Sequence, residues 1–246
     1  MTGTAGHFPS PRTPCMLRRK PRQVQPVEAS VLPHAARPLE LERVTLSLGG
    51  VPLFGPLDIS VAAGTVTTVM GPSGCGKSSL LAWICGTLAP EFEASGTARV
   101  DGAPLDGLPP EVRRVGILFQ DDLLFPHLSV GDNLAFGLPP HVRGRTERRA
   151  RIAAALAEAD LAGMEERDPD TLSGGQRARV AVMRTLLSEP RALLLDEPFS
   201  RLDAALRERF RAFVFEHARQ QGIPTLLVTH DPEDAAGAGG PVVALG

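Results

Sequence analysis

The sequence has no long apolar run among its 246 residues. Its longest apolar stretches are short, such as Thr65–Met70 and Ala192–Leu195. A membrane-spanning helix needs roughly 20 consecutive apolar residues, so we expect a chain that does not cross a bilayer by itself. The N-terminus also lacks the apolar core of a secretory signal peptide, so we expect no leader of that kind.

The sequence also has few cysteines and a small net charge. Cys15, Cys75 and Cys85 are an odd number of cysteines at scattered positions, which gives neither a disulfide framework nor a metal-ligand spacing. This usage fits a reducing, cytosolic location. The formal net charge of −2 lacks the basic excess that is usual in nucleic-acid-binding domains, so we expect no nucleic-acid partner.

The first 38 residues differ in composition from the rest of the chain. Residues 1–38 are rich in proline and arginine and have no apolar periodicity. Such a segment cannot bury enough apolar surface to offset its ordering entropy, so we predict a disordered tail. Its basic run, residues 18–22, either is solvated or contacts a membrane surface or a partner. Residues 39–246 suffice for one core with an attached subdomain.

Beyond the tail, short apolar strands come first and then alternate with helices. This alternation predicts an α/β fold built on parallel strands. An Ala- and Gly-rich stretch near the C-terminus, residues 232–240, predicts a short or frayed helix. The predicted strands are 39–48, 57–61, 65–70, 97–100, 115–119, 192–196, 225–229 and 242–245, and the other predicted helices are 77–85, 146–162, 176–187 and 204–220.

Residues 71–78 read Gly-Pro-Ser-Gly-Cys-Gly-Lys-Ser, which is a phosphate-loop pattern between a predicted strand and a predicted helix. The glycines allow positive φ angles, so several N–H groups can point at phosphates, and the helix start adds its positive dipole end. Lys77 would balance charge on the β- and γ-phosphates, and Ser78 can ligate Mg²⁺. We interpret Cys75 as a small variable position rather than a redox group. The predicted nucleotide-binding residues here are Gly71, Pro72, Ser73, Gly74, Cys75, Gly76, Lys77, Ser78 and Ser79.

A pair of acidic residues follows the apolar strand at 192–195, where Asp196 and Glu197 are adjacent. An Asp at a strand end can hold Mg²⁺ through its water shell, and a neighbouring carboxylate can polarise an attacking water. We therefore assign Asp196 as a metal residue and Glu197 as the catalytic base. The motif is weak alone and gains strength from the phosphate loop.

Residues 172–176, Leu-Ser-Gly-Gly-Gln, resemble the signature motif of ATP-binding cassette (ABC) proteins. Other motifs lie along the chain in the order found in that family. Gln120 resembles the Q-loop glutamine, residues 200–203 resemble the D-loop, and His230 resembles the switch histidine. The resemblance covers about residue 39 to the C-terminus. It implies a P-loop NTPase (RecA-like) core with a mixed, mainly parallel sheet, an antiparallel β subdomain and a helical subdomain at about residues 121–187.

The resemblance also implies site roles and a dimer. Physically, Ser173, Gly174 and Gly175 open a helix and form a second anion-binding helix start. In the family, two subunits face head to tail, and the signature of one caps ATP on the other. Ser173, Gly174, Gly175, Gln176 and Asp203 thus join the nucleotide-contacting residues. Gln120 would sense Mg²⁺ and the attacking water, His230 would contact the γ-phosphate and help position Glu197, and Asp203 would couple the subunits. The predicted catalytic residues are Glu197, His230, Gln120 and Lys77, and the metal residues are Ser78, Gln120 and Asp196.

The function implied is ATP hydrolysis that drives a membrane transporter from the cytoplasmic face. Residues 121–134 resemble importer subunits for thiamine, ferric iron, sulfate or polyamines, and we expect residues 125–127 near the docking surface for transmembrane permease subunits. An importer leaves room for a periplasmic or extracellular solute-binding protein. Two alternatives stay open: a soluble ABC ATPase acting in nucleic-acid repair or translation, and a regulatory subunit that binds nucleotide without hydrolysing it.

Two positions depart from the family pattern. Leu48 stands where an aromatic residue usually stacks on adenine, the chain has no tyrosine, and Phe54 is nearby but displaced. We therefore expect weak discrimination between ATP and GTP. Arg201 occupies a D-loop position where a smaller residue is usual.

Overall fold

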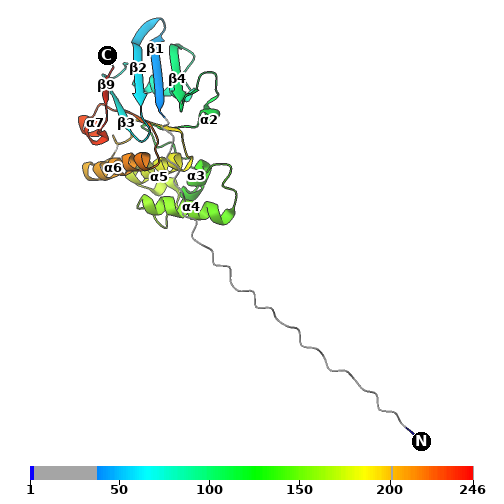
Figure 1. Cartoon of the computed structure of the whole chain (residues 1–246). Coiled ribbons are helices and arrows are strands. Elements are labelled where there is room, and N and C mark those ends of the chain that lie inside the picture. The colour runs from blue at the N-terminus through cyan, green and yellow to red at the C-terminus, as the bar shows by residue number, and fades with distance from the viewer. Residues whose placement is uncertain (3–37, 201, 246) are drawn as a thin grey trace. The chain divides into compact units, whose positions relative to one another are not determined.

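The strands of the protein divide between two sheets, as the computed structural model in Figure 1 shows. The structure describes residues 1–2, 38–200 and 202–245. The predicted disordered tail falls almost wholly outside the described residues, and so does Arg201.

The first sheet is antiparallel, with strands in the order β2-β1-β4-β5. Strands β2 and β4 are longer than the sequence predicts. The prediction stopped short because Pro52, Gly55 and Gly96 interrupt the apolar alternation there. β1 accommodates register shifts between Leu41 and Val44 against β2. The strands are β1 (Leu39–Leu48), β2 (Val51–Val61), β4 (Phe92–Val100) and β5 (Ala103–Pro104).

The second sheet has five strands in the order β6-β7-β8-β3-β9, and every neighbouring pair is parallel. The α/β class is confirmed. Parallel and antiparallel strands do not share one sheet here, because the antiparallel strands pair among themselves. The strands are β3 (Val66–Met70), β6 (Val115–Leu118), β7 (Ala192–Asp196), β8 (Thr225–Val228) and β9 (Val242–Ala244).

The parallel sheet separates two hydrophobic cores. Successive side chains of a strand point to opposite faces, and β7 shows the consequence directly. Leu193 and Leu195 pack with the helices, whereas Ala192 and Leu194 pack with the antiparallel sheet and α1 (Lys77–Cys85). All four are fully buried. A strand that is covered on both faces reads as a continuous apolar run, which is the pattern found at 192–195.

Most helices lie where the sequence predicts them, and the predicted short helix at 232–240 is seven residues long. The helix α3 was not predicted, because it is short and contains Gly131 and Gly137, which disfavour helix. Ser129 compensates by capping it, accepting from the backbone N–H of Asp132 at 3.0 Å. Helices α3, α4 and α5 gather on the side away from the antiparallel sheet (Figure 1). The remaining helices are α2 (Pro110–Arg113), α3 (Val130–Gly137), α4 (Arg145–Glu158), α5 (Gly174–Leu187), α6 (Ala204–Gln220) and α7 (Pro232–Ala238).

Candidate active site

The predicted site residues outside the signature and D-loop segments follow the carboxyl ends of four parallel strands. β3 leads into the loop 71–76, β6 into Gln120, and β8 into His230, while β7 ends at Asp196. These four strands are consecutive neighbours in the sheet, in the order β6-β7-β8-β3. Carboxyl ends of parallel strands meet at one edge of a sheet, which is where ligands bind in such folds.

The phosphate loop closes around the amine of Lys77. Its Nζ donates to the backbone oxygens of Gly71 at 2.7 Å and Pro72 at 2.8 Å, and the residue is only 7% exposed. Gly76 has a φ of +95°, a left-handed conformation that favours glycine, and it immediately precedes the first residue of α1. Gly71 is required for space, because a Cβ there would lie 2.3 Å from the backbone oxygen of Leu245.

Ser78 and Asp196 bring two oxygen ligands together beside this loop. Ser78 Oγ donates to Asp196 Oδ1 at 3.1 Å. Burial raises the pKa of the Asp196 carboxyl above its ordinary value, the hydrogen bond from Ser78 opposes that shift, and the neighbouring Glu197 adds to it. A desolvated carboxylate next to a hydroxyl is a donor pair that suits a hard cation such as Mg²⁺.

Glu197 reaches the same edge because the backbone turns immediately after β7. Its φ is +48°, the left-handed region that is uncommon for a residue with a side chain. Backbone and side-chain hydrogen bonds from Ser200 to the Glu197 carbonyl hold this turn, at 3.2 and 2.9 Å. Residues held in such conformations cluster at functional sites. The strand alternation that sends adjacent side chains to opposite faces therefore ends before Glu197.

Glu197 and His230 form a pair across the sheet edge. The Nδ1 atom of His230 lies 2.9 Å from Glu197 Oε1. The Glu197 backbone N–H donates to the Val228 carbonyl at 2.9 Å, so the two loops are also joined through their backbones. The structure thus brings a carboxylate that could accept a proton within hydrogen-bond distance of an imidazole.

Gln120 lies two residues beyond β6 and is exposed. Within the described part of the chain, no hydrogen bond joins its side chain to Ser78, Asp196 or Glu197. Its predicted role in sensing the metal and water therefore remains a prediction. The loop that follows it is held by the helix α5, since Arg177 Nε lies 3.5 Å from Asp122 Oδ2 and Arg184 donates to the Leu123 carbonyl at 2.9 Å.

Ser173 begins the helix α5 at the molecular surface. Its Oγ accepts from the backbone N–H of Gln176 at 3.3 Å, and the Gln176 side chain accepts from the Ser173 N–H at 2.9 Å, which completes a capping box. Ser173 and Gly174 are exposed. Asp203 is likewise exposed and caps the helix α6, accepting from the Leu206 N–H at 3.0 Å. In the described ranges, no hydrogen bond or ion pair joins residues 173–176 to the phosphate loop.

Phe54 has a closer relation to the phosphate loop than its sequence position indicates. A Cβ added to Gly76 would meet the Phe54 ring at 3.0 Å, so the ring lies against the loop backbone. Leu48, at the position expected for an aromatic residue, ends β1 and is 40% exposed. Sequence reasoning set Phe54 aside as displaced; the signal that could have found it is that no other aromatic residue stands between Leu48 and the loop.

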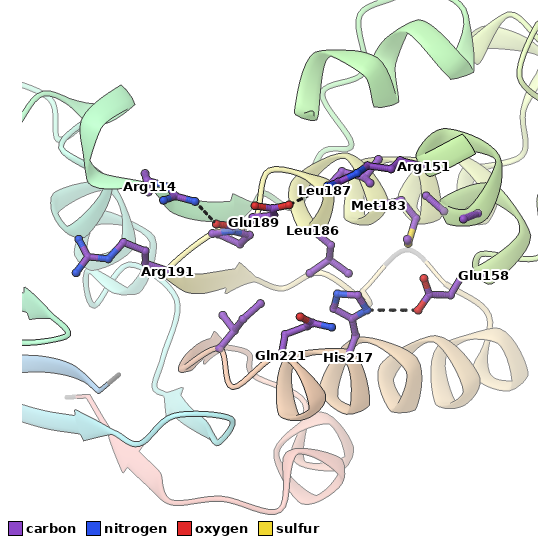
Figure 2. A pocket seen from close by; sticks show the side chains of 14 residues that line it. Arg114, Arg151, Glu158, Met183, Leu186, Leu187, Glu189, Arg191, His217 and Gln221 are labelled. Atoms are coloured by element: carbon purple, nitrogen blue, oxygen red, sulfur yellow. Dashed lines mark hydrogen bonds and ion pairs between the residues drawn. The ribbon is translucent and has the colours of Figure 1, made fainter. Parts of the chain in front are cut away.

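A hollow of about 520 Å³ lies at the opposite end of the parallel sheet, before β6, β7 and β8 (Figure 2). Its charged groups pair with one another or with backbone oxygens. Glu158 pairs with His217 at 3.3 Å, Arg151 with Glu189 at 2.9 Å, and Arg114 donates to the Glu189 carbonyl. This hollow is separate from the site residues at the carboxyl edge.

Comparison with known proteins decides the family. A family model described as "ABC transporter" matches residues 54–200, which is more than half of the chain. The chain belongs to the ABC transporter family. As an ATP-binding member it is an ATPase whose activity is coupled to transport, which confirms the prediction from the phosphate loop and signature motifs.

Three relatives illustrate the similarity. The ABC transporter ATP-binding protein YnjD of Escherichia coli is 48% identical over 79% of this chain and 89% of its own length. A thiamine import ATP-binding protein of Cereibacter sphaeroides is 46% identical over 80% of this chain and 83% of its own. An Fe(3+) ions import ATP-binding protein of Haemophilus influenzae is 40% identical over 84% of this chain, which spans 62% of that protein.

Proposed function

We propose that this ABC protein is the ATP-hydrolysing subunit of an importer, that it binds ATP with Mg²⁺, and that it works as two copies arranged head to tail. The observation that carries the proposal is the pair formed by Glu197 and His230, 2.9 Å apart at the edge that also holds the phosphate loop. The import direction is supported by the iron and thiamine import proteins among its relatives.

The catalytic roles proposed here are supported by the geometry of the edge. Glu197 accepts a proton from the attacking water, and His230 holds that carboxylate in place. Lys77 moves from the loop carbonyls of Gly71 and Pro72 to the β- and γ-phosphates, because phosphate oxygens carry more charge than carbonyl oxygens. The intact Glu197 and His230 disfavour the non-hydrolysing alternative.

Mg²⁺ fits the oxygen pair of Ser78 and Asp196. When bound, the ion neutralises charge on the β- and γ-phosphates. Among the described residues, no group of three or more His, Cys, Asp or Glu side chains is placed to hold a metal. Phosphate oxygens and waters would therefore complete the coordination shell, with Gln120 as a further ligand after a movement of its loop.

The head-to-tail dimer is supported by the exposure of the signature segment. Ser173 caps a 14-residue helix that begins at Gly174, and both residues are exposed. Helix starts of this kind bind anions. A second copy would bring its γ-phosphate to this start, and the exposed Asp203 would lie at the same interface.

The permease partner is proposed to dock on a patch made of the aromatic residues Phe125, His127 and Phe136 and the exposed Leu123. Phe125 and Phe136 contact edge to face with centroids 4.8 Å apart, and Phe136 is 70% exposed. Exposed aromatic side chains that gather in one place are typical of protein interfaces. None of the described helices is long and apolar enough to span a membrane. We place the chain at the cytoplasmic face, attached through the permease, with a solute-binding protein on the other side.

Co-purification tests the partner class. The tagged chain, expressed in its native cell and extracted in mild detergent, is expected to carry a polytopic membrane protein and to release phosphate from ATP. Phe136→Asp is expected to lose the membrane protein, because a charge would be buried in the interface. Thermal unfolding checks that the variant is folded.

Val112→Asp supplies the matched control, because Val112 is 53% exposed on α2, outside the patch. This variant is expected to retain the partner. Recovery of nucleic acid instead of a membrane protein would favour the soluble repair or translation alternative. Nucleotide binding without phosphate release would favour the regulatory alternative.

Leu48→Tyr is expected to strengthen ATP binding and to increase the preference for ATP over GTP. Base–aromatic stacking contributes about 1–3 kcal/mol, or roughly 5- to 150-fold in affinity. Titration with ATP and GTP, compared between parent and variant, measures the effect. A parent chain that already prefers ATP strongly would contradict our interpretation of Leu48 and would point to the ring of Phe54 beside Gly76.

A further inference from the structure

The imidazole of His230 has little packing of its own to hold it. Its side chain is 68% exposed, whereas that of its partner Glu197 is only 22% exposed. The position of the imidazole therefore depends on the backbone that carries it. That backbone leaves β8 at Val228 and enters α7 at Pro232, so only residues 229–231 connect the two elements.

Asp231 holds the far end of this connection with both carboxylate oxygens. One oxygen caps α7, accepting from the Glu233 N–H at 2.8 Å. The other accepts from Arg207 Nη1 at 2.7 Å, and both side chains are 24% exposed. Charge-assisted hydrogen bonds of this length are among the stronger ones in proteins. The residue next to His230 is thus attached to the helix α6.

A second ion pair supports the same loop from the other side. Arg211, one helical turn after Arg207, lies 3.1 Å from Asp234, which is almost fully buried. The other oxygen of Asp234 accepts from Thr229 Oγ1 at 3.3 Å. Gly237 leaves room for this arginine, since a Cβ there would lie 2.4 Å from Arg211 Nε. Two arginines of α6 therefore hold the residues on either side of His230.

The Arg207 side chain also contacts the segment just before α6, where the D-loop ends. Arg207 Nη2 donates to the Leu202 carbonyl at 3.4 Å, and its backbone N–H donates to the Asp203 carbonyl at 2.8 Å. One guanidinium thus contacts both the end of the D-loop and the residue that follows the switch histidine.

We propose that Arg207 is a positioning residue for ATP hydrolysis, which holds the His230 loop against Glu197 through Asp231 and ties that loop to the D-loop end of α6. The inference rests on the proposed role of His230. Arg207 touches neither Glu197 nor the phosphate loop in the described residues, so it acts through the loop. Misplacement of a catalytic group by about 1 Å can lower the rate about 100-fold.

Steady-state ATP hydrolysis by the full chain tests this role. Arg207→Met is expected to lower kcat about 10- to 100-fold, with KM and fluorescent-ATP affinity within about twofold of the parent. Arg207→Lys is expected to recover part of kcat, because an ammonium can still reach one oxygen of Asp231. In a His230→Ala background, Arg207→Met is expected to cause no further loss, because the two residues act through one contact.

Arg209→Met is the matched control, because Arg209 lies on the same helix in an exposed pair with Asp160 at 3.2 Å. It is expected to keep the parent kcat. A normal kcat in a folded Arg207→Met variant, or independent losses in the double variant, would overturn the inference. If His230→Ala alone leaves kcat unchanged, the proposed function of His230 fails instead, which separates the two outcomes.

Discussion

Glu197→Gln is expected to stop ATP turnover while ATP still binds. In the parent chain, His230 Nδ1 lies 2.9 Å from a Glu197 carboxylate oxygen. The amide keeps the size of the side chain and this hydrogen bond, but it cannot accept a proton from water at neutral pH. Loss of a general base costs about 10²–10⁴-fold in rate. ATP affinity depends on the phosphate loop, which does not contact Glu197 through any hydrogen bond in the described residues.

Phosphate release and equilibrium binding of a fluorescent ATP analogue measure the two properties separately. If ATP holds two copies head to tail, the Gln variant should also trap an ATP-bound dimer, visible by light scattering. Glu208→Gln is a suitable control, since Glu208 is an exposed residue of α6. Turnover of the Glu197 variant at the parent rate would remove Glu197 as the base.

Lys77→Met is expected to weaken ATP binding and to abolish hydrolysis. The buried amine donates to the carbonyls of Gly71 and Pro72, and it is the cation that would meet the β- and γ-phosphates. A hydrogen bond to a charged group contributes about 1.5–3 kcal/mol, so the loss of one weakens binding roughly 10- to 150-fold. Methionine keeps the apolar stem, so the fold should remain.

Amine labelling gives a direct readout of this lysine, because Lys20 and Lys77 are the two lysines of the chain. In the parent, ATP is expected to protect Lys77 from a lysine-modifying reagent and to leave Lys20 unprotected, as read by peptide mass spectrometry. Lys20→Met should bind ATP as the parent does. If Lys77 is labelled without ATP and saturating ATP does not reduce that labelling, its contact with phosphates would be contradicted.

The comparison of sequence with structure is clearest at three places. The loop 71–78 was predicted with its flanking strand and helix, because glycine spacing and apolar runs act locally along the chain. The helix α3 was missed, because its stability comes from the Ser129 cap and from packing of Val130 and Leu134 in the core. Phe54 was set aside, because distance along the chain does not report the approach of β2 to Gly76.

The sequence by itself determined the motifs, the α/β class and the family, since each depends on residue types at short, fixed spacings. Only the tertiary structure decided which distant side chains meet. Ser78 contacts Asp196, Glu197 contacts His230, and Arg207 contacts Asp231 because parallel strands and the helices between them bring their ends to one edge. The left-handed turn at Glu197 is likewise a property of the folded backbone.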